Sequence, residues 1–232
     1  MKIHKMINPP YLASVEITRR CNNRCVYCHQ EKSETDMPVD RFSDWLDDLA
    51  AKGFKAVAVG GGEPTLHPDL PGILNTARQR GFTAGLTTNA QDPELVIRLA
   101  DEGLLRTFGV SAGKGRWTEL APHPRAIVNL LLLKNGLPQV MDWAIQAIRK
   151  GAGTLLLLGY KGTVSHFRPE TDELSEAFLL LTRLGRNFGI AVAADDYTRR
   201  RLCLTETCGN GFIRIDINGI TDKCCFSDCE YR

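Results

Sequence analysis

The chain has 232 residues, of which 43% are hydrophobic and 24% charged, a composition typical of a protein that folds around a hydrophobic core. This length suits one large domain, or one domain with a small appendage. The formal net charge of +2 gives no reason to expect binding to nucleic acid or to an anionic membrane. The longest apolar runs are too short to cross a bilayer, and residues 1–10 lack the apolar segment of a secretory signal. We therefore expect a cytoplasmic protein.

Short apolar runs alternate with amphipathic stretches along most of the chain. The expected elements, in chain order, are strand 12–17, helix 39–52, strand 56–59, helix 69–80, strand 83–87, helix 93–102, strand 106–110, strand 127–133, helix 138–150, strand 154–158, helix 171–188 and strand 190–193. Pro38 and Gly53 bracket the first helix in the order that helix ends favour. The segment 111–126 leaves room for only one or two helical turns before its prolines.

This alternation of strand and helix predicts an α/β fold in which a parallel sheet is covered by helices. A closed barrel of eight such units usually needs about 250 residues. The residues before the second group of cysteines are too few for that, so we expect a partial (β/α)6 barrel of the TIM type. In parallel architectures, ligands bind at the carboxyl ends of the strands, and the loops that follow the strands are where a site is expected.

The eight cysteines are the unusual feature of the composition, because they fall into two groups with none between. The groups are Cys21, Cys25 and Cys28, and then Cys203, Cys208, Cys224, Cys225 and Cys229. A disulfide framework is typical of short secreted chains, and this chain is neither short nor predicted to be secreted. The thiols are better interpreted as ligands of a metal or an iron–sulfur cluster.

Cys21, Cys25 and Cys28 have the spacing C-x3-C-x2-C, in the loop after the first strand. Three thiolates on one loop can hold three corners of a 4Fe–4S cluster and leave the fourth iron without a protein ligand. An open coordination position is typical of a centre that does chemistry. A zinc site with His29 as fourth ligand is the alternative. The arginines beside the motif favour the thiolate form of the cysteines.

The C-x3-C-x2-C motif after the first strand of a partial barrel resembles that of the radical S-adenosylmethionine (SAM) superfamily. The loop after the second strand reads GGGEPTLHP and resembles the GGE motif of the same superfamily. Glycines at Gly61 and Gly62 let the backbone approach a ligand closely, and Glu63 offers a carboxylate to a charged amino group. The glycine-rich loop alone is a weak signal, but one strand–helix unit after the cysteine motif it becomes a strong one.

Further positions resemble SAM-contacting residues of the superfamily. Tyr27 stands directly before the third cysteine, where the superfamily often has an aromatic residue near the adenine. Thr88, Ser111 and Asn135 follow the third, fourth and fifth expected strands. For these three residues, a helix cap or a loop hydrogen bond is an equally good interpretation.

The resemblance implies a cofactor set and a reaction. A 4Fe–4S cluster would bind SAM through its open iron, and one electron would cleave SAM to a 5′-deoxyadenosyl radical that abstracts hydrogen from a substrate. The electron would come from a donor such as flavodoxin or ferredoxin. The sequence identifies no general base and no residue that quenches a radical.

The second cysteine group surrounds a predicted β-hairpin. Residues 212–217 alternate as a strand does, and Asn218-Gly219 is a strong turn signal, so Cys224 should return close to Cys208. Four of the thiols, with Cys203, Cys208, Cys224 and Cys229 as the expected set, suffice for an auxiliary 4Fe–4S cluster. Which cysteine is spare stays open, although Cys225 should point away from Cys224. A structural zinc site is the alternative.

A cysteine, a hairpin and further cysteines after the barrel resemble the SPASM and twitch extensions of some radical SAM enzymes. We therefore expect a radical SAM barrel over 1–195 and a twitch-like extension over 196–232. Relatives with such tails often modify peptides or proteins, which makes a peptide or protein the expected substrate. A small molecule or nucleotide is the alternative within the superfamily. A non-enzymatic iron–sulfur or zinc protein is the alternative outside it.

Overall fold

The structure is a computed structural model that describes residues 11–226 and 229–231. Residues 1–10, on which the expectation of no secretory signal rests, lie outside the described residues. The principal elements are β1 (Leu12–Thr18), α1 (Val39–Ala51), β2 (Ala56–Gly61), α2 (Leu70–Gln79), β3 (Thr83–Thr88), α3 (Pro93–Asp101), β4 (Thr107–Ser111), α4 (Trp117–Leu120), β5 (Ala126–Leu132), α5 (Leu137–Arg149), β6 (Thr154–Gly159), α6 (Thr171–Phe188), β7 (Ala191–Ala194), α7 (Asp196–Arg201), β8 (Phe212–Ile215) and β9 (Thr221–Asp222). The predicted elements are confirmed to within a few residues at their ends.

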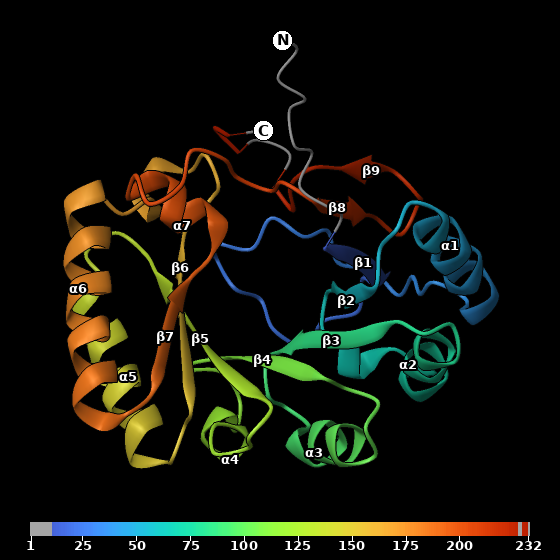
Figure 1. Ribbon diagram of the computed structural model, residues 1–232, viewed down its shortest axis with the longest axis horizontal. Helices are drawn as coiled ribbons and strands as arrows, with labels where there is room; N and C mark the ends of the chain where they lie inside the picture. The colour runs from blue at the N-terminus through green and yellow to red at the C-terminus, as the bar shows by residue number, and fades with distance from the viewer. Residues whose placement is uncertain (1–10, 227–228, 232) are drawn as a thin grey trace, which may run out of the picture.

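The strands form one curved sheet in the order β7-β6-β5-β4-β3-β2-β1-β8-β9. Neighbouring strands from β7 to β8 run parallel, and only β9 pairs antiparallel within the described residues. Figure 1 shows the strands curving around an open centre with the helices on the outside. The predicted α/β partial barrel is confirmed.

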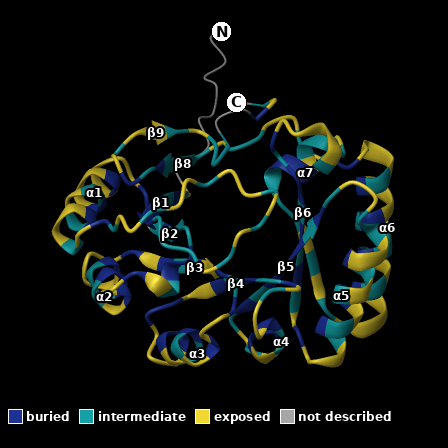
Figure 2. Ribbon diagram, turned by 180° about the vertical axis from the view of Figure 1, so that it is seen from behind, coloured by how far each residue is buried: buried dark blue, intermediate teal, exposed yellow. Residues whose placement is uncertain are grey.

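The helices pack on the convex face of the sheet because alternate strand residues are apolar. In β1, Ala13, Val15 and Ile17 are fully buried and share one core with Phe42 and Leu46 of α1. Figure 2 shows the same pattern around the barrel, with buried residues on the inner side of each helix and exposed residues on the outer side. The concave face of the sheet carries the intervening residues, which include polar ones such as Glu16 and apolar ones such as Leu131 and Leu158.

The C-terminal segment joins the barrel sheet. β8 lies parallel to β1, with Ser14 opposite Arg214, and β9 pairs antiparallel with β8. The sequence predicted a strand here but did not predict its pairing with β1. It also did not predict α7, whose first turn is capped by Asp195 through a hydrogen bond from Thr198 N.

Among the helices of the described residues, none combines the length and the apolar character that crossing a bilayer requires.

Candidate functional site

A cavity of about 320 Å³ opens at the carboxyl ends of the strands. It is bordered by the loops after β1, β2, β3, β4, β6 and β7. Its lining residues include Cys21, Cys25, Tyr27, Cys28, Gly62, Glu63, Thr88, Asn89, Ser111, Lys114, Leu131, Leu158, Tyr160, Lys161, Asp195 and Phe226. Residues separated by more than two hundred positions therefore face one cavity. This is the end of the barrel at which the sequence predicts a site.

The three cysteines of the first group all line this cavity. Cys21 and Cys25 are partly buried and Cys28 is exposed. In Figure 1 the segment between β1 and α1, which carries the cysteines, crosses the open centre of the sheet. The structure thus brings the three thiols to the face where the motif predicts them.

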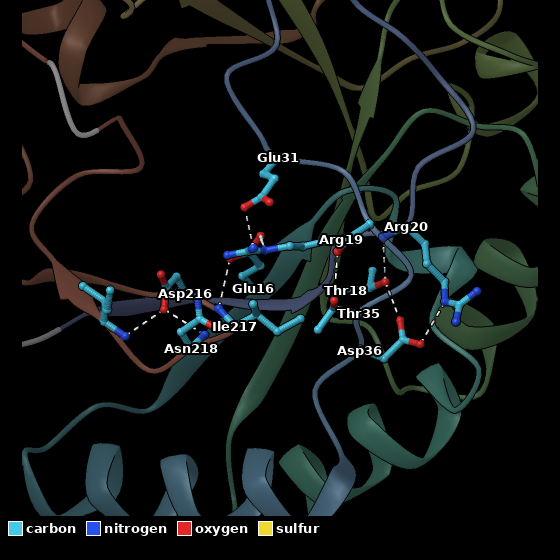
Figure 3. A network of polar contacts seen from close by, with 12 residues as sticks. Glu16, Thr18, Arg19, Arg20, Glu31, Thr35, Asp36, Asp216, Ile217 and Asn218 are labelled. Carbon is cyan, nitrogen blue, oxygen red and sulfur yellow. Dashed lines mark hydrogen bonds and ion pairs between the residues drawn. The ribbon is translucent and has the colours of Figure 1, made fainter.

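Ion pairs attach the cysteine loop to its own base, as Figure 3 shows. Arg19 Nη1 donates to Glu31 Oε2 at 2.6 Å, and Arg20 Nε donates to Asp36 Oδ2 at 2.8 Å. Asp36 Oδ1 also accepts a hydrogen bond of 2.6 Å from Thr18 Oγ1. The sequence predicts that the arginines beside the motif favour the thiolate form of the cysteines, and this stays a prediction; in the structure the guanidinium groups of Arg19 and Arg20 pair with carboxylates.

The loop after β2 approaches the cysteine loop through backbone hydrogen bonds. Gly62 N donates to Thr18 O at 2.8 Å, and Glu63 N donates to Arg20 O at 2.7 Å. A Cβ at Gly62 would overlap the carbonyl oxygen of Arg20, and Gly61 has a φ of +115° with the Thr18 carbonyl against it. The glycines are required here because two backbones meet without room for a side chain.

Glu63 is almost fully buried, at 1% exposure. Its Oε1 accepts hydrogen bonds of 2.8 Å from both Thr65 Oγ1 and Thr88 Oγ1, and its Oε2 accepts one of 2.6 Å from Asn89 N. A carboxylate has about four acceptor positions, so Oε2 keeps capacity for a further donor from the cavity. Glu63 therefore joins the ends of β2 and β3 as well as lining the site.

The other predicted SAM-contacting residues differ in position. Tyr27, Thr88 and Ser111 line the cavity, and Gly61 lies behind Gly62 against the base of the cysteine loop. Asn135 does not line the cavity. It has a φ of +60° at the turn before α5, where its N–H donates to Glu173 Oε2 at 3.1 Å. The loop after β5 turns away from the barrel mouth. That a residue follows a strand in the sequence does not predict in which direction its loop turns.

Lys114 is a cavity residue that the sequence analysis missed. It follows β4, and its Nζ lies 3.3 Å from Cys25 Sγ and 5.2 Å from the centre of the Tyr27 ring. Burial alone would lower the pKa of Lys114, but its contacts with Tyr27 and Cys25 outweigh this and raise the pKa. The side chain is therefore a cation beside the cysteine motif at neutral pH. The sequence signal that could have predicted this residue is a lysine between two glycines in the segment after a strand.

Lys161 and Asp195 form an ion pair at the edge of the cavity. Lys161 Nζ lies 2.7 Å from Asp195 Oδ2. Burial alone would lower the pKa of Lys161, but the Asp195 carboxylate outweighs this and raises it. Asp195 directly follows β7, and Lys161 is the second residue after β6, so the pair joins the ends of these two strands.

Glu16, on the concave face of β1, connects the cysteine loop to the C-terminal segment. The residue is only 4% exposed. Its Oε2 accepts a hydrogen bond of 3.0 Å from Ile217 N and lies 3.7 Å from Arg214 Nη2. Its Oε1 lies 3.5 Å from Arg19 Nε, on the side of the network that leads to Glu31. One buried carboxylate thus has partners from both cysteine-bearing segments.

The cavity wall opposite the GGE loop is apolar. It consists of Leu131 of β5, Leu158 of β6, and the aromatic side chains of Tyr160 and Phe226. The two rings lie 6.3 Å apart between centroids at an interplanar angle of 82°. Such a wall excludes water from one side of the site, while the cysteines and Glu63 form the polar side.

Three of the tail cysteines, Cys208, Cys225 and Cys229, have Lys161 as an electrostatic neighbour. Cys229 is buried, and burial together with the neighbouring Cys224 raises the pKa of its thiol. Burial, with Cys229 and Cys224 as negative neighbours, raises the pKa of Cys208 to about 11. Burial also raises the pKa of Cys225, which has Lys161 and Ser14 among its neighbours. Cys203 is exposed.

In the described part of the chain, no three His, Cys, Asp or Glu side chains stand close enough together to hold a metal ion as they are placed. The donor set nevertheless suits an iron–sulfur cluster at the first motif. Three thiols of one loop face one cavity, and a cation lies beside one of them. His29 Nε2 lies 2.9 Å from Cys225 O, so the fourth ligand of the zinc alternative already has another contact.

Comparison with known proteins identifies the N-terminal part of the barrel. Residues 15–113, which include both motif loops, match the model of the radical SAM superfamily. These residues resemble a radical SAM domain. The matched range includes Cys21, Cys25, Cys28 and Glu63, and it ends directly before Lys114.

Curated relatives match about a third to two fifths of this chain. The Fe-coproporphyrin III synthase of Methanosarcina barkeri is 35% identical over 94 residues, which are 38% of this chain and 24% of the relative. The S-adenosylmethionine-dependent nucleotide dehydratase of Selenomonas ruminantium is 33% identical over 34% of this chain and 30% of the relative. A PqqA peptide cyclase of Rhodopseudomonas palustris is 33% identical over 41% of this chain and 27% of the relative. The matches span about a quarter to a third of these relatives, all of which are enzymes.

Solved structures match nearly the whole chain in fold. Streptococcus suis SuiB bound to its precursor peptide SuiA has a TM-score of 0.75 at 16% identity, covering 93% of this chain and 59% of SuiB. The anSMEcpe structure with bound AdoMet and a Cp18Cys peptide has a TM-score of 0.68 at 15% identity, covering 94% of this chain and 74% of anSMEcpe. The strands of this chain therefore form a partial barrel that is similar in fold to these proteins.

Proposed function

We propose that the chain is a radical SAM enzyme that holds a 4Fe–4S cluster on Cys21, Cys25 and Cys28. With SAM bound beside it, such a cluster supplies the electron for reductive cleavage of SAM to a 5′-deoxyadenosyl radical, which removes hydrogen from a substrate. The observation that carries this proposal is the single cavity that the three thiols, Gly62 and Glu63 share at the carboxyl end of the barrel.

The chain's own residues would bind, orient and shield. Glu63 Oε2 keeps acceptor capacity toward the cavity, which suits the ammonium group of SAM. Tyr27, Thr88 and Ser111 also line the cavity and are proposed SAM contacts. Asn135 is left out of this set because it lies away from the cavity. The apolar wall with Leu158 would keep water from the site during the reaction.

The test is SAM cleavage by protein reconstituted anaerobically with iron and sulfide. With dithionite and SAM we expect 5′-deoxyadenosine in the wild type and none in Cys25→Ala, because two thiolates cannot retain the cluster. Val26→Ala is the matched control, because this neighbour is 80% exposed and should leave cleavage unchanged. Absence of 5′-deoxyadenosine from wild-type protein that holds four irons would reject the proposal and favour a non-enzymatic iron–sulfur protein.

For the substrate we propose a peptide or protein. The likeness in fold to SuiB and anSMEcpe, both solved with peptides, supports this class. A small molecule or nucleotide is the second candidate, which the nucleotide dehydratase and the Fe-coproporphyrin III synthase favour at higher sequence identity. Deuterium transferred into 5′-deoxyadenosine from deuterated peptides would support the peptide class. Transfer from deuterated nucleotides would support the second candidate. The electron donor is proposed to be a flavodoxin or ferredoxin.

For the tail we propose a twitch-like extension over 196–232 that binds an auxiliary 4Fe–4S cluster. Cys208, Cys224 and Cys229 support it as electrostatic neighbours of one another, and these three and the exposed Cys203 would have to move closer together to hold a cluster. An iron content near eight per chain would support the second cluster, and one near four would reject it. Zinc bound to the chain would favour a structural zinc site. Replacing Cys208, Cys224 and Cys229 by Ser should lower eight irons to four.

A further inference from the structure

Lys114 reaches from the loop after β4 to the first cysteine motif. Its Nζ donates a hydrogen bond of 3.3 Å to Cys25 Sγ and lies over the Tyr27 ring, 5.2 Å from its centre. Lys114 and Cys25 are 89 residues apart in the chain, so this contact depends on the folded barrel. The Lys114 ammonium group contacts both the Cys25 sulfur and the face of the Tyr27 ring, and these two contacts together restrict its position.

The backbone around Lys114 is constrained on both sides. Gly113 and Gly115 have φ values of +73° and +42°, which side-chain-bearing residues rarely adopt. A Cβ at Gly113 would overlap the Trp143 ring, and one at Gly115 would overlap the carbonyl oxygen of Ala90. The loop is therefore pressed between α5 and the end of β3, and this packing directs Lys114 toward the cysteines.

The other ammonium groups that line the cavity have different partners. Lys161 is paired with Asp195, and Lys32 donates to the carbonyl oxygen of Asn23. Across the residues that the structure describes, Lys114 is the one cation with a hydrogen bond to a cysteine sulfur of the first motif. Arg19 and Arg20, although adjacent to Cys21 in sequence, pair with carboxylates.

We propose that Lys114 is a positioning residue for Cys25, whose sulfur it holds by a charge-assisted hydrogen bond when that sulfur is a ligand of the cluster. This inference rests on the proposed function. Hydrogen bonds to cluster sulfurs and nearby charge are among the factors that set the reduction potential of iron–sulfur clusters. Reduction adds negative charge to the cluster, so a fixed cation beside it favours the reduced form and raises the potential.

The experiment is a redox titration of the reconstituted full chain, followed by electron paramagnetic resonance of the reduced cluster. In Lys114→Met we expect the midpoint potential to shift to a more negative value. Lys114→Arg keeps a cationic donor and should remain closer to the wild type. Lys32→Met removes a cation from the same cavity without removing a sulfur contact, and its shift should be clearly smaller.

Two outcomes would overturn the inference. An unchanged potential in Lys114→Met, with weaker SAM binding measured in the same preparation, would assign Lys114 to SAM rather than to Cys25. Equal shifts in Lys114→Met and Lys32→Met would show a general effect of charge in the cavity without a role for the hydrogen bond.

A second measurement is independent of the cluster. Deuterium exchange in peptides covering residues 21–28 of the metal-free protein should be faster in Lys114→Met than in the wild type, because one contact that fixes this loop is lost. Unchanged exchange would contradict the contact itself. Failure of the wild type to assemble four irons would instead reject the proposed function, and exchange would still decide whether Lys114 fixes the loop.

Discussion

Glu63 shows how one side chain serves the fold and the site together. Its buried carboxylate accepts hydrogen bonds from Thr65, Thr88 and Asn89. These donors come from the loops after β2 and β3, which both border the cavity. A residue that the sequence suggests for ligand binding is therefore also part of the frame that fixes the cavity wall.

Glu63→Ala should lower the free energy of unfolding by about 2–3 kcal/mol, because the Thr88 hydroxyl and the Asn89 N–H lose a charged acceptor in a buried place. Urea denaturation monitored by circular dichroism measures this change. An unfolding free energy equal to that of the wild type would contradict the assigned hydrogen bonds.

The pKa of Asp36 predicts how the stability of the protein depends on pH. Burial alone would raise its pKa, but hydrogen bonds from Thr18 and Arg20 and the Arg20 charge outweigh this and hold the pKa below its usual value. An acid with a lowered pKa in the folded state stabilises the protein above its unfolded pKa of about 3.9 and loses this contribution as the pH falls through its folded pKa.

The stability difference between the wild type and Asp36→Asn should therefore be largest above about pH 4 and should shrink at lower pH. Unfolding free energies measured from pH 6 down to pH 3 test this, since the variant has no titrating group at the position. A difference that stays constant over this range would be inconsistent with the low pKa of Asp36.

At the scale of elements, the meeting of the β2 loop with the cysteine loop depends on glycine. Gly62 has the carbonyl group of Arg20 where a Cβ would stand, whereas a Cβ at Gly60 would meet nothing within 4 Å. Both glycines belong to the same GGG run, so the sequence alone does not separate them.

Gly62→Ala should lower the unfolding free energy by about 1–3 kcal/mol and reduce iron retention, because the two loops are forced apart. Gly60→Ala is the matched control and should stay near the wild type in both respects. Thermal unfolding and iron analysis of the two variants provide the comparison. Equal effects would indicate that the close approach at Gly62 is unimportant.

At the scale of the whole molecule, Glu16 connects segments 201 residues apart. Its carboxylate lies between Arg19 of the cysteine loop and Ile217 of the tail (Figure 3), and Arg214 of β8 is a further partner. The pairing of β8 with β1 is therefore reinforced from the concave side of the sheet. Both cysteine groups are held relative to each other through this residue.

Glu16→Ala should lower the free energy of unfolding by about 3 kcal/mol or more. The guanidinium groups of Arg19 and Arg214 and the N–H of Ile217 would lose their buried acceptor. Glu31→Ala removes the solvent-exposed partner of Arg19 and should have little effect on unfolding. Amide exchange at Ile217 is the local measurement and should quicken in Glu16→Ala only. Similar losses in both variants would argue against a special role for the buried carboxylate.

The sequence by itself determined the elements and the two motif loops. Periodicities of two and 3.6 residues are local, and they located the strands and helices from 12 to 194. The spacing of Cys21, Cys25 and Cys28 after β1, with Gly62 and Glu63 after β2, predicted which loops would meet. This was possible because parallel strands bring their carboxyl ends to one edge.

Only the tertiary structure decided how the loops point and which distant groups meet. Asn135 follows a strand as Ser111 does, yet its loop turns away, and Lys114 reaches Cys25 because Gly113 and Gly115 permit a backbone that packing selects. The contact of Glu16 with Ile217 likewise depends on β8 choosing β1 as its partner. Such contacts join residues far apart in the chain, and they depend on the packing of the whole barrel rather than on any local pattern.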